Sequence, residues 1–275
     1  AAFIDEYRFT NSALYTSNFT PVSPLEIGGG GTGWGTLPAD VIFAVPAEAN
    51  GNDVAQFGLT PTVTGANITY PTSGSRTGDG YIANSNGSTA VDARIKYAIS
   101  PAWFAAWGAA TSMTIEYDVY NNQLDYPGGQ YMQLMYGFSV QTNTGTAGEW
   151  RTDMSLLSST VASASPVLEC GRWYHIAQVA DGVNRELRLY IDGTLADTQA
   201  VPADRFMFEA YPNGVDALSL LQVHDSSGDG SLNGRLDNVV ITTRAKYSAN
   251  FTPGMTFAEI VGYTPPPSNV DVTGA

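Results

Sequence analysis

Apolar and polar residues alternate along much of the chain, and apolar residues at helical spacing are nearly absent. In Met113–Val119 every second residue is apolar, so Glu116 and Asp118 fall on the opposite face of the expected strand. Comparable runs cover residues 93–99, 130–140, 173–180, 186–191, 217–223 and 235–242. Asp181-Gly182 and Asp192-Gly193 provide the short turns of antiparallel hairpins. Many short strands with such turns predict an all-β sandwich.

A segment near the start of the chain is repeated near its end, without a gap. Ile4–Thr10, Tyr15 and Asn18–Pro21 correspond to Leu236–Thr242, Tyr247 and Asn250–Pro253. Agreement that includes a whole Asn-Phe-Thr-Pro tetrad is improbable by chance. The later copy is expected to close the sandwich. The earlier copy is either the closing strand of a preceding unit or a strand that pairs with a sheet edge, in this chain or a neighbour. The candidate residues of this assembly strand are Ile4, Asp5, Tyr7 and Phe9.

Two stretches without strand patterning divide the chain into four parts. The glycine-rich run at residues 28–35 has few side chains to pack and is not followed by Gly-Lys-Ser/Thr, so we expect a flexible linker or a long surface loop and no phosphate-binding loop. Three consecutive prolines after Thr264 predict a stiff, extended tail. The expected parts are an N-terminal strand segment (1–27), a glycine-rich linker (28–39), the sandwich (40–257) and a proline-rich tail (258–275).

Composition excludes several classes of protein. The 275 residues include 12 Lys and Arg against 26 Asp and Glu, which gives a net charge of −14. This charge repels phosphate backbones, so we expect no nucleic-acid partner. With 43% hydrophobic and 14% charged residues, the chain is too apolar for disorder. No apolar run approaches the length of a membrane span, and no leader pattern is visible, so neither a span nor a signal peptide is expected.

Three stretches, Gly171–Ala177, Leu189–Gly193 and Leu232–Val239, share the pattern of a known group of proteins. They resemble the laminin-G-like, concanavalin-A-like jelly rolls over about residues 40–257. The ending, with Lys246-Tyr247 before Asn250–Pro253, resembles modules of bacteriophage tail, fibre and capsid-associated proteins. This resemblance implies a sandwich of two curved antiparallel sheets. It also implies functions from glycan binding and particle adhesion to scaffolding, with enzymes among distant relatives.

The segment Glu116–Asn121 bears on catalysis. Related retaining glucanases carry Glu-x-Asp-x-(x)-Glu, because one carboxylate attacks the sugar while a second protonates the leaving oxygen. Here Tyr120 or Asn121 stands at the third position, and neither can act as a general acid. Glu116 and Asp118 alone would lie about 6–7 Å apart, a spacing compatible with inversion. We instead interpret them as a solvated strand face and His175 as structural. We therefore predict no catalytic residue and no enzyme.

Metal binding is the better-supported candidate chemistry, in the segment Asp225–Gly234. Calcium takes six to eight oxygen ligands, and a glycine-rich turn lets carboxylates and carbonyls converge on one ion. The segment resembles the approach to the last strand in pentraxin-like relatives, in which the residue at the position of Asp225 is a calcium ligand. The candidate ligands are Asp225, Asp229 and Asn233. The alternative interpretation is a simple Asp/Gly turn.

Aromatic side chains could stack on sugar rings. Trp150, after the polar loop at residues 141–148, is the expected exposed platform, together with Tyr126 and Tyr131. We place Trp173 in the core.

The sequence therefore predicts a non-enzymatic module on a virion surface or in an extracellular location, with virion decoration or tail adhesion as its role. The expected partners are other virion subunits or copies of itself, a host-surface glycan is a candidate ligand, and calcium is a candidate cofactor. Two alternatives stay open: a glucanase-like carbohydrate-active enzyme, and a polymer-forming structural subunit that exchanges its N-terminal strand.

Overall fold

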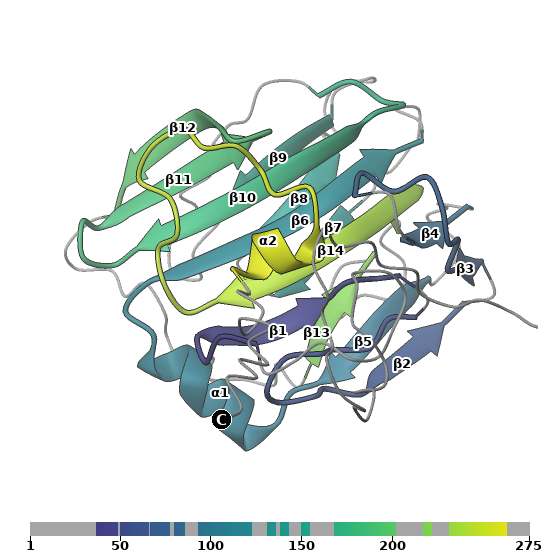
Figure 1. Ribbon diagram of the computed structural model, residues 1–275, viewed down its shortest axis with the longest axis horizontal. Coiled ribbons are helices and arrows are strands. Elements are labelled where there is room, and N and C mark those ends of the chain that lie inside the picture. The colour runs from purple at the N-terminus through teal and green to yellow at the C-terminus, as the bar shows by residue number, and fades with distance from the viewer. Residues whose placement is uncertain are drawn as a thin grey trace, which may run out of the picture.

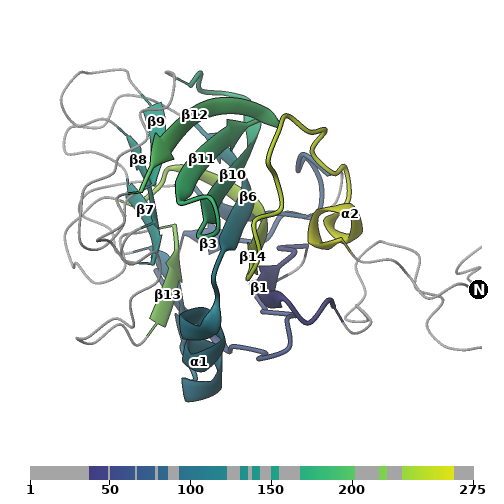
Figure 2. The same ribbon diagram turned by 90° about the vertical axis from the view of Figure 1, so that its left-hand side faces the viewer.

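The computed structural model describes residues 37–48, 50–65, 67–77, 80–85, 93–122, 168–201, 217–221 and 231–262, together with the backbone of three strands at 131–135, 138–142 and 150–154. Within these ranges the strands stack in two layers, and two short helices lie at their margins (Figures 1 and 2). No helix among these residues has the length and apolar character needed to cross a bilayer.

The larger layer is a single sheet with the strand order β12-β11-β10-β6-β14-β4-β3, and β1 also pairs with β14. Its strands are β1 (Val41–Val45), β3 (Ile68–Thr69), β4 (Ile82–Asn84), β6 (Met113–Asn121), β10 (Trp173–Asp181), β11 (Glu186–Ile191), β12 (Thr194–Ala200) and β14 (Gly234–Thr242). All of these pairs are antiparallel. The central strands β10, β6 and β14 therefore come from distant parts of the sequence.

The second layer contains two three-stranded antiparallel sheets. One has the order β13-β5-β2 and the other β7-β8-β9, with β7 running beside β13 (Figure 2). The strands are β2 (Pro61–Thr64), β5 (Arg94–Ala98), β7 (Tyr131–Met135), β8 (Phe138–Thr142), β9 (Trp150–Met154) and β13 (Ala217–Leu220). The predicted all-β, two-layered antiparallel sandwich is confirmed.

One strand boundary differs from the expectation. The run predicted as a single strand at residues 130–140 contains β7 and β8, which pair with each other in antiparallel register. Tyr136 and Gly137 separate the two strands, and a two-residue spacing that contains glycine suits a tight hairpin. Alternation alone could not reveal this reversal, because it continues on both sides of the turn.

The core lies between the two layers and follows the predicted alternation. On β6 the inward residues are Met113, Ile115, Tyr117 and Val119, each with 0–1% exposure. Helix α1 (Pro101–Ala109), capped by the Ser100 side chain, covers one end of the sandwich. The Trp103 indole is fully buried there and donates to the Ile42 carbonyl at 2.8 Å. Burial of side chains of this size, at about 1.5–3 kcal/mol each, accounts for most of the stability.

The outer face of the large sheet is also covered. After β14 the chain turns back as a segment that we call the strap, residues 243–262, and it ends in helix α2 (Phe257–Val261) (Figure 1). Phe257, Ile260 and Val261 of α2 pack against apolar residues of β1 and β14. Tyr247 and Phe251 pack over Ala177, Val179 and Tyr190 of β10 and β11. The central strands of the large sheet are thus buried on both faces.

Candidate functional site

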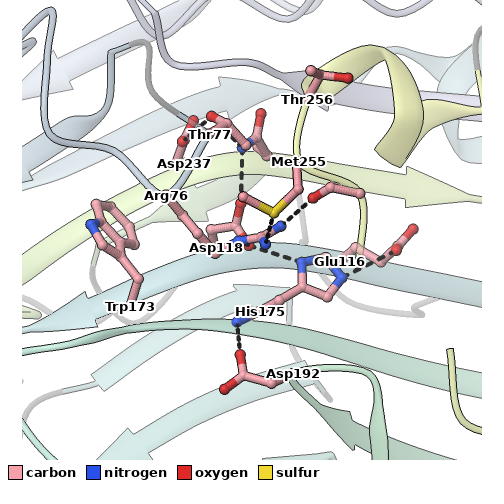
Figure 3. Close-up of polar contacts among 12 residues, drawn as sticks. Arg76, Thr77, Glu116, Asp118, Trp173, His175, Asp192, Asp237, Met255 and Thr256 are labelled. Carbon is pink, nitrogen blue, oxygen red and sulfur yellow. Dashed lines mark hydrogen bonds and ion pairs between the residues drawn. The ribbon is translucent and has the colours of Figure 1, made fainter. Parts of the chain in front are cut away.

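Charged side chains gather between the outer sheet face and the strap, and strand register explains how they meet. His175 of β10 and Asp237 of β14 both pair with Asp118 of β6, from opposite sides. The register of β14 shifts just after Asp237, where Asn238 has a positive φ of 50°. Such a bulge turns two consecutive side chains toward the same face. Both Asp237 and Asn238 therefore contribute to the cluster, which is shown in Figure 3.

Asp118 is at the centre of the cluster and is fully buried. Its Oδ1 accepts a hydrogen bond from Arg76 Nε at 2.7 Å and lies 2.8 Å from His175 Nδ1. Its Oδ2 accepts from Asn238 Nδ2 at 2.9 Å. Hydrogen bonds that involve charged groups are stronger than neutral ones, which offsets the cost of burying this carboxylate.

Glu116, two residues before Asp118 on β6, also has a partner at each carboxylate oxygen. Its Oε1 accepts from the Tyr247 hydroxyl at 2.6 Å and lies 3.4 Å from His175 Nε2. Its Oε2 accepts from Lys246 Nζ. Burial would raise the pKa of Glu116, but the neighbouring His175 imidazole and Lys246 ammonium outweigh it and hold that pKa below its ordinary value.

His175 lies between the two carboxylates and is 1% exposed. Burial favours its neutral form, but Asp118 and Glu116 outweigh burial and raise the pKa of the imidazole. A protonated ring directs one N–H toward each carboxylate. The backbone of His175 is also fixed, because its N–H donates to Asp192 Oδ1 at 2.9 Å.

Asp237 differs from the other carboxyl groups of the cluster in its raised pKa and its incomplete hydrogen bonding. Burial and the charge of Asp118 raise its pKa to about 8. One carboxyl oxygen accepts from Thr77 Oγ1 at 3.0 Å, and the other is buried without a hydrogen-bond partner among the described residues. Two adjacent carboxylates resist simultaneous ionisation, so Asp237 is protonated at neutral pH while Asp118 keeps its cationic partners.

The strap closes this cluster off from solvent. Arg76 Nη2 donates to the Gly254 carbonyl at 2.6 Å, and Lys246 Nζ donates to the Ile260 carbonyl at 2.5 Å. The Phe251 ring meets the His175 ring edge to face at 6.0 Å. Glu116 and Asp118 are both 0% exposed. The prediction that they share one strand face is correct, but the expectation that this face is solvated is wrong, because the strap covers it.

Much of the chain matches the sequence model of a known protein family. Residues 97–250, more than half of the chain, match the model of a family described as the concanavalin A-like lectin/glucanases superfamily. The chain belongs to this superfamily. A search of curated protein sequences gives no match to this concanavalin A-like protein.

Solved structures share the fold at low sequence identity. The structure from a study of botulinum neurotoxin type C and two ganglioside molecules matches with a TM-score of 0.54 and 12% identity, over 76% of this chain and 49% of that one. Domain 4 of AbnA, an extracellular arabinanase from Geobacillus stearothermophilus in complex with arabinotriose, matches with a TM-score of 0.50 and 15% identity, over 75% and 93%. The concanavalin A-like chain spans about half of the toxin chain, and these likenesses establish the fold.

The predicted calcium segment is described only at its end. Asn233 precedes β14 and is 8% exposed, and its side-chain oxygen accepts from Asn122 Nδ2 at 3.0 Å. Asp225 and Asp229 lie outside the described residues, so the calcium site stays a prediction. Among the residues the structure describes, no three His, Cys, Asp or Glu side chains are grouped to hold a metal ion.

The predicted sugar-binding and assembly residues are only partly visible. Trp150 begins β9 and Tyr131 begins β7, at the same end of one sheet, since they pair with Thr142 and Gln141 of β8. Only the backbone of these strands is described. Tyr126 and the assembly residues Ile4, Asp5, Tyr7 and Phe9 lie outside the described ranges.

Trp173 is not in the core, contrary to expectation. It lies on the outer face of β10, on the same side as His175, and is only partly buried. Its indole donates to the Gly74 carbonyl at 3.1 Å, and its ring meets Tyr120 edge to face at 5.6 Å. The Arg235 guanidinium lies 4.4 Å from the centre of the Tyr120 ring. Because Trp173 and His175 are two residues apart on one strand, strand periodicity places both side chains on the same face of β10.

Proposed function

We propose that this protein is a non-catalytic, lectin-like adhesion module, displayed on a virion or another extracellular surface, that recognises glycans. The observation that carries the proposal is the burial and full pairing of the two carboxylates on β6, Glu116 and Asp118. Glycoside hydrolysis needs two carboxyl groups that flank the scissile bond, with space for a sugar ring between them. Neither group has that access here.

Opening this site would require more than a side-chain rotation. The strap would have to leave the sheet, which breaks the contacts of Lys246 and Tyr247 with Glu116 and that of Gly254 with Arg76. Hydrogen bonds to charged groups contribute about 1.5–3 kcal/mol each, and the carboxylates would lose several together. The cluster therefore serves to hold the strap, and the binding function belongs to another surface.

Aromatic side chains at the edge of the sandwich are the candidates for that surface. Trp173 and Tyr120 are partly exposed at one end of the large sheet, close to the Arg235 guanidinium. Trp150 and Tyr131, on strands of the opposite layer, remain candidates, and so does Tyr126, which lies outside the described residues. Aromatic rings present broad apolar faces to a sugar, while a guanidinium donates hydrogen bonds to hydroxyl groups.

The comparisons and the charge support a glycan ligand and an outward-facing location. The arabinanase domain with this fold is described in complex with arabinotriose, and the toxin study names ganglioside molecules. The net charge of −14 keeps a displayed protein soluble and away from polyanions. The resemblance of the Asn250–Pro253 ending to phage tail and capsid-associated modules supports a virion as the surface.

A glycan array probed with and without EDTA tests the proposal, with Trp173→Ala and Trp150→Ala as paired variants. We expect binding by the native protein and its loss in one of the two variants. Loss of binding in EDTA would assign the calcium site at Asp225, Asp229 and Asn233 to the same function. Absence of any bound glycan in both conditions would overturn the lectin proposal. Hydrolysis of a β-glucan that Glu116→Gln abolishes would show that the protein is an enzyme.

A further inference from the structure

We propose that residues 11–21 are a second strap, which docks on the outer sheet face of another, non-identical module of this fold. On that module, residues 11–21 would occupy the position that residues 243–253 occupy on the large sheet of this one. The proposal concerns assembly and does not depend on glycan binding. It rests on the contacts that the strap makes in the structure and on the repeat of its sequence near the N-terminus.

The strap is held on the sheet by a small number of residues. The Tyr247 hydroxyl donates to Glu116, and its ring stacks on the Phe251 ring with centroids 3.5 Å apart and planes at 2°. Phe251 N–H donates to the Gly193 carbonyl at 2.9 Å. Asn250 Oδ1 accepts from Leu195 N–H at 2.8 Å. These contacts attach the strap to β6 and to the β11–β12 hairpin.

The residues that make these contacts are the ones that recur near the N-terminus. Tyr247 corresponds to Tyr15, and the tetrad Asn250–Pro253 corresponds to Asn18–Pro21. Between them, Ser248 and Ala249 differ from their counterparts. Identity is therefore concentrated at the positions that contact the sheet, as expected for a second segment that binds the same kind of surface.

The described part of the chain forms one such surface, and the sequence contains two segments that match it. In this module the surface is occupied by residues 243–253 (Figure 1). Residues 11–21 therefore need a surface on another module. The stretch from Val22 to Asp40 spans at most about 60 Å when extended, at about 3.3 Å per residue, which is enough to reach an adjacent domain.

One difference between the copies indicates that the acceptor is not an identical copy. Lys246, which pairs with the buried Glu116, corresponds to Leu14. On this sheet a leucine at that position would leave a buried carboxylate without its cation. The acceptor sheet is therefore expected to be neutral where this module has Glu116.

The test uses the full chain as an adjustable acceptor and a synthetic peptide of residues 1–21 as donor. Phe251→Ala loosens the resident strap, and Glu116→Gln makes the sheet neutral. We expect the peptide to raise the Tm of the chain that carries both substitutions, in a concentration-dependent manner. Affinity should fall by about tenfold or more when Glu116 is retained, because each tenfold corresponds to about 1.4 kcal/mol of buried-charge cost.

A control peptide with Tyr15→Ala and Phe19→Ala should leave the Tm unchanged. If Phe251→Ala prevents folding, Asn250→Ala replaces it, since that substitution removes only the hydrogen bond to Leu195. Slower hydrogen exchange at the Leu195 amide on peptide addition would place the peptide in the strap position. The proposal is overturned if neither acceptor responds to the peptide, if the control peptide acts equally, or if retaining Glu116 does not weaken binding.

Discussion

The protonated carboxyl of Asp237 gives the most direct test of the buried cluster, through the pH dependence of stability. Its pKa is raised from 3.8 to about 8 in the folded protein. The folded state therefore retains a proton that the unfolded chain releases at a lower pH. Its contribution to stability is complete below pH 4, declines as the pH rises, and is lost once the pH has passed about 8.

The size of this effect follows from the shift. Each pKa unit corresponds to about 1.4 kcal/mol, so a shift of about 4 units sets an upper figure of about 6 kcal/mol. Asp237→Asn removes the titration while keeping an oxygen that can accept from Thr77. The variant should match the native protein near pH 4. At pH 9 we expect its free energy of unfolding to exceed the native value by several kcal/mol.

Urea unfolding followed by tryptophan fluorescence at intervals from pH 4 to pH 9 measures the difference. Thr198→Ala, on the edge strand β12, removes no titrating group and is the control for the effect of a substitution itself. The remaining titrating groups are common to both proteins and cancel in the difference. A constant difference between the Asp237→Asn variant and the native protein across this range would refute the assignment of a neutral Asp237.

Three further predictions concern the strap and its anchors. Glu116→Gln should destabilise the protein by about 3–5 kcal/mol in urea unfolding, because Lys246 loses its buried partner, and adding Lys246→Met should recover most of the loss. Gly193→Ala should lower the Tm, because a Cβ there would lie 2.0 Å from the Phe251 carbonyl oxygen and Gly193 has a φ of 75°. Gly108→Ala in α1 is the control: no atom lies within 4 Å of its added Cβ, so it should raise stability by about 0.5–1 kcal/mol. NMR titration of the His175 ring nitrogens should show a charged imidazole above pH 6.5, with stability lost as the pH rises through its elevated pKa.

Alternation of apolar and polar residues was sufficient to predict the sandwich and the inward face of β6. It worked for β6 because strand periodicity is local and the inward residues are large and apolar. It failed at residues 130–140 because a hairpin of two similar strands continues the same pattern through its turn. The Asp192-Gly193 turn was predicted correctly, since glycine and aspartate supply the positive φ values of 75° and 49° that the turn requires.

The site could not be predicted in the same way, because its burial depends on a segment distant in sequence. Nothing in Glu116 or Asp118 indicates that Lys246 and Tyr247 will cover them, some 130 residues later. The bulge at Asn238 also has no local glycine signal. One indication was present: the repeat marks Tyr247 and the Asn250–Pro253 tetrad as residues with a specific task, although it does not identify the surface they contact.

The cationic partners of the two carboxylates come from three separate segments, and this origin suggests what the charges accomplish. Arg76 belongs to the loop before β4, His175 to β10 and Lys246 to the strap. An apolar strap could slide along an apolar sheet at little cost. With Glu116 buried, a shift of one residue would separate it from Lys246 and leave an unpaired charge, at a cost of several kcal/mol. The carboxylates therefore fix the register of the strap, and a segment with leucine in place of Lys246 is rejected by this sheet.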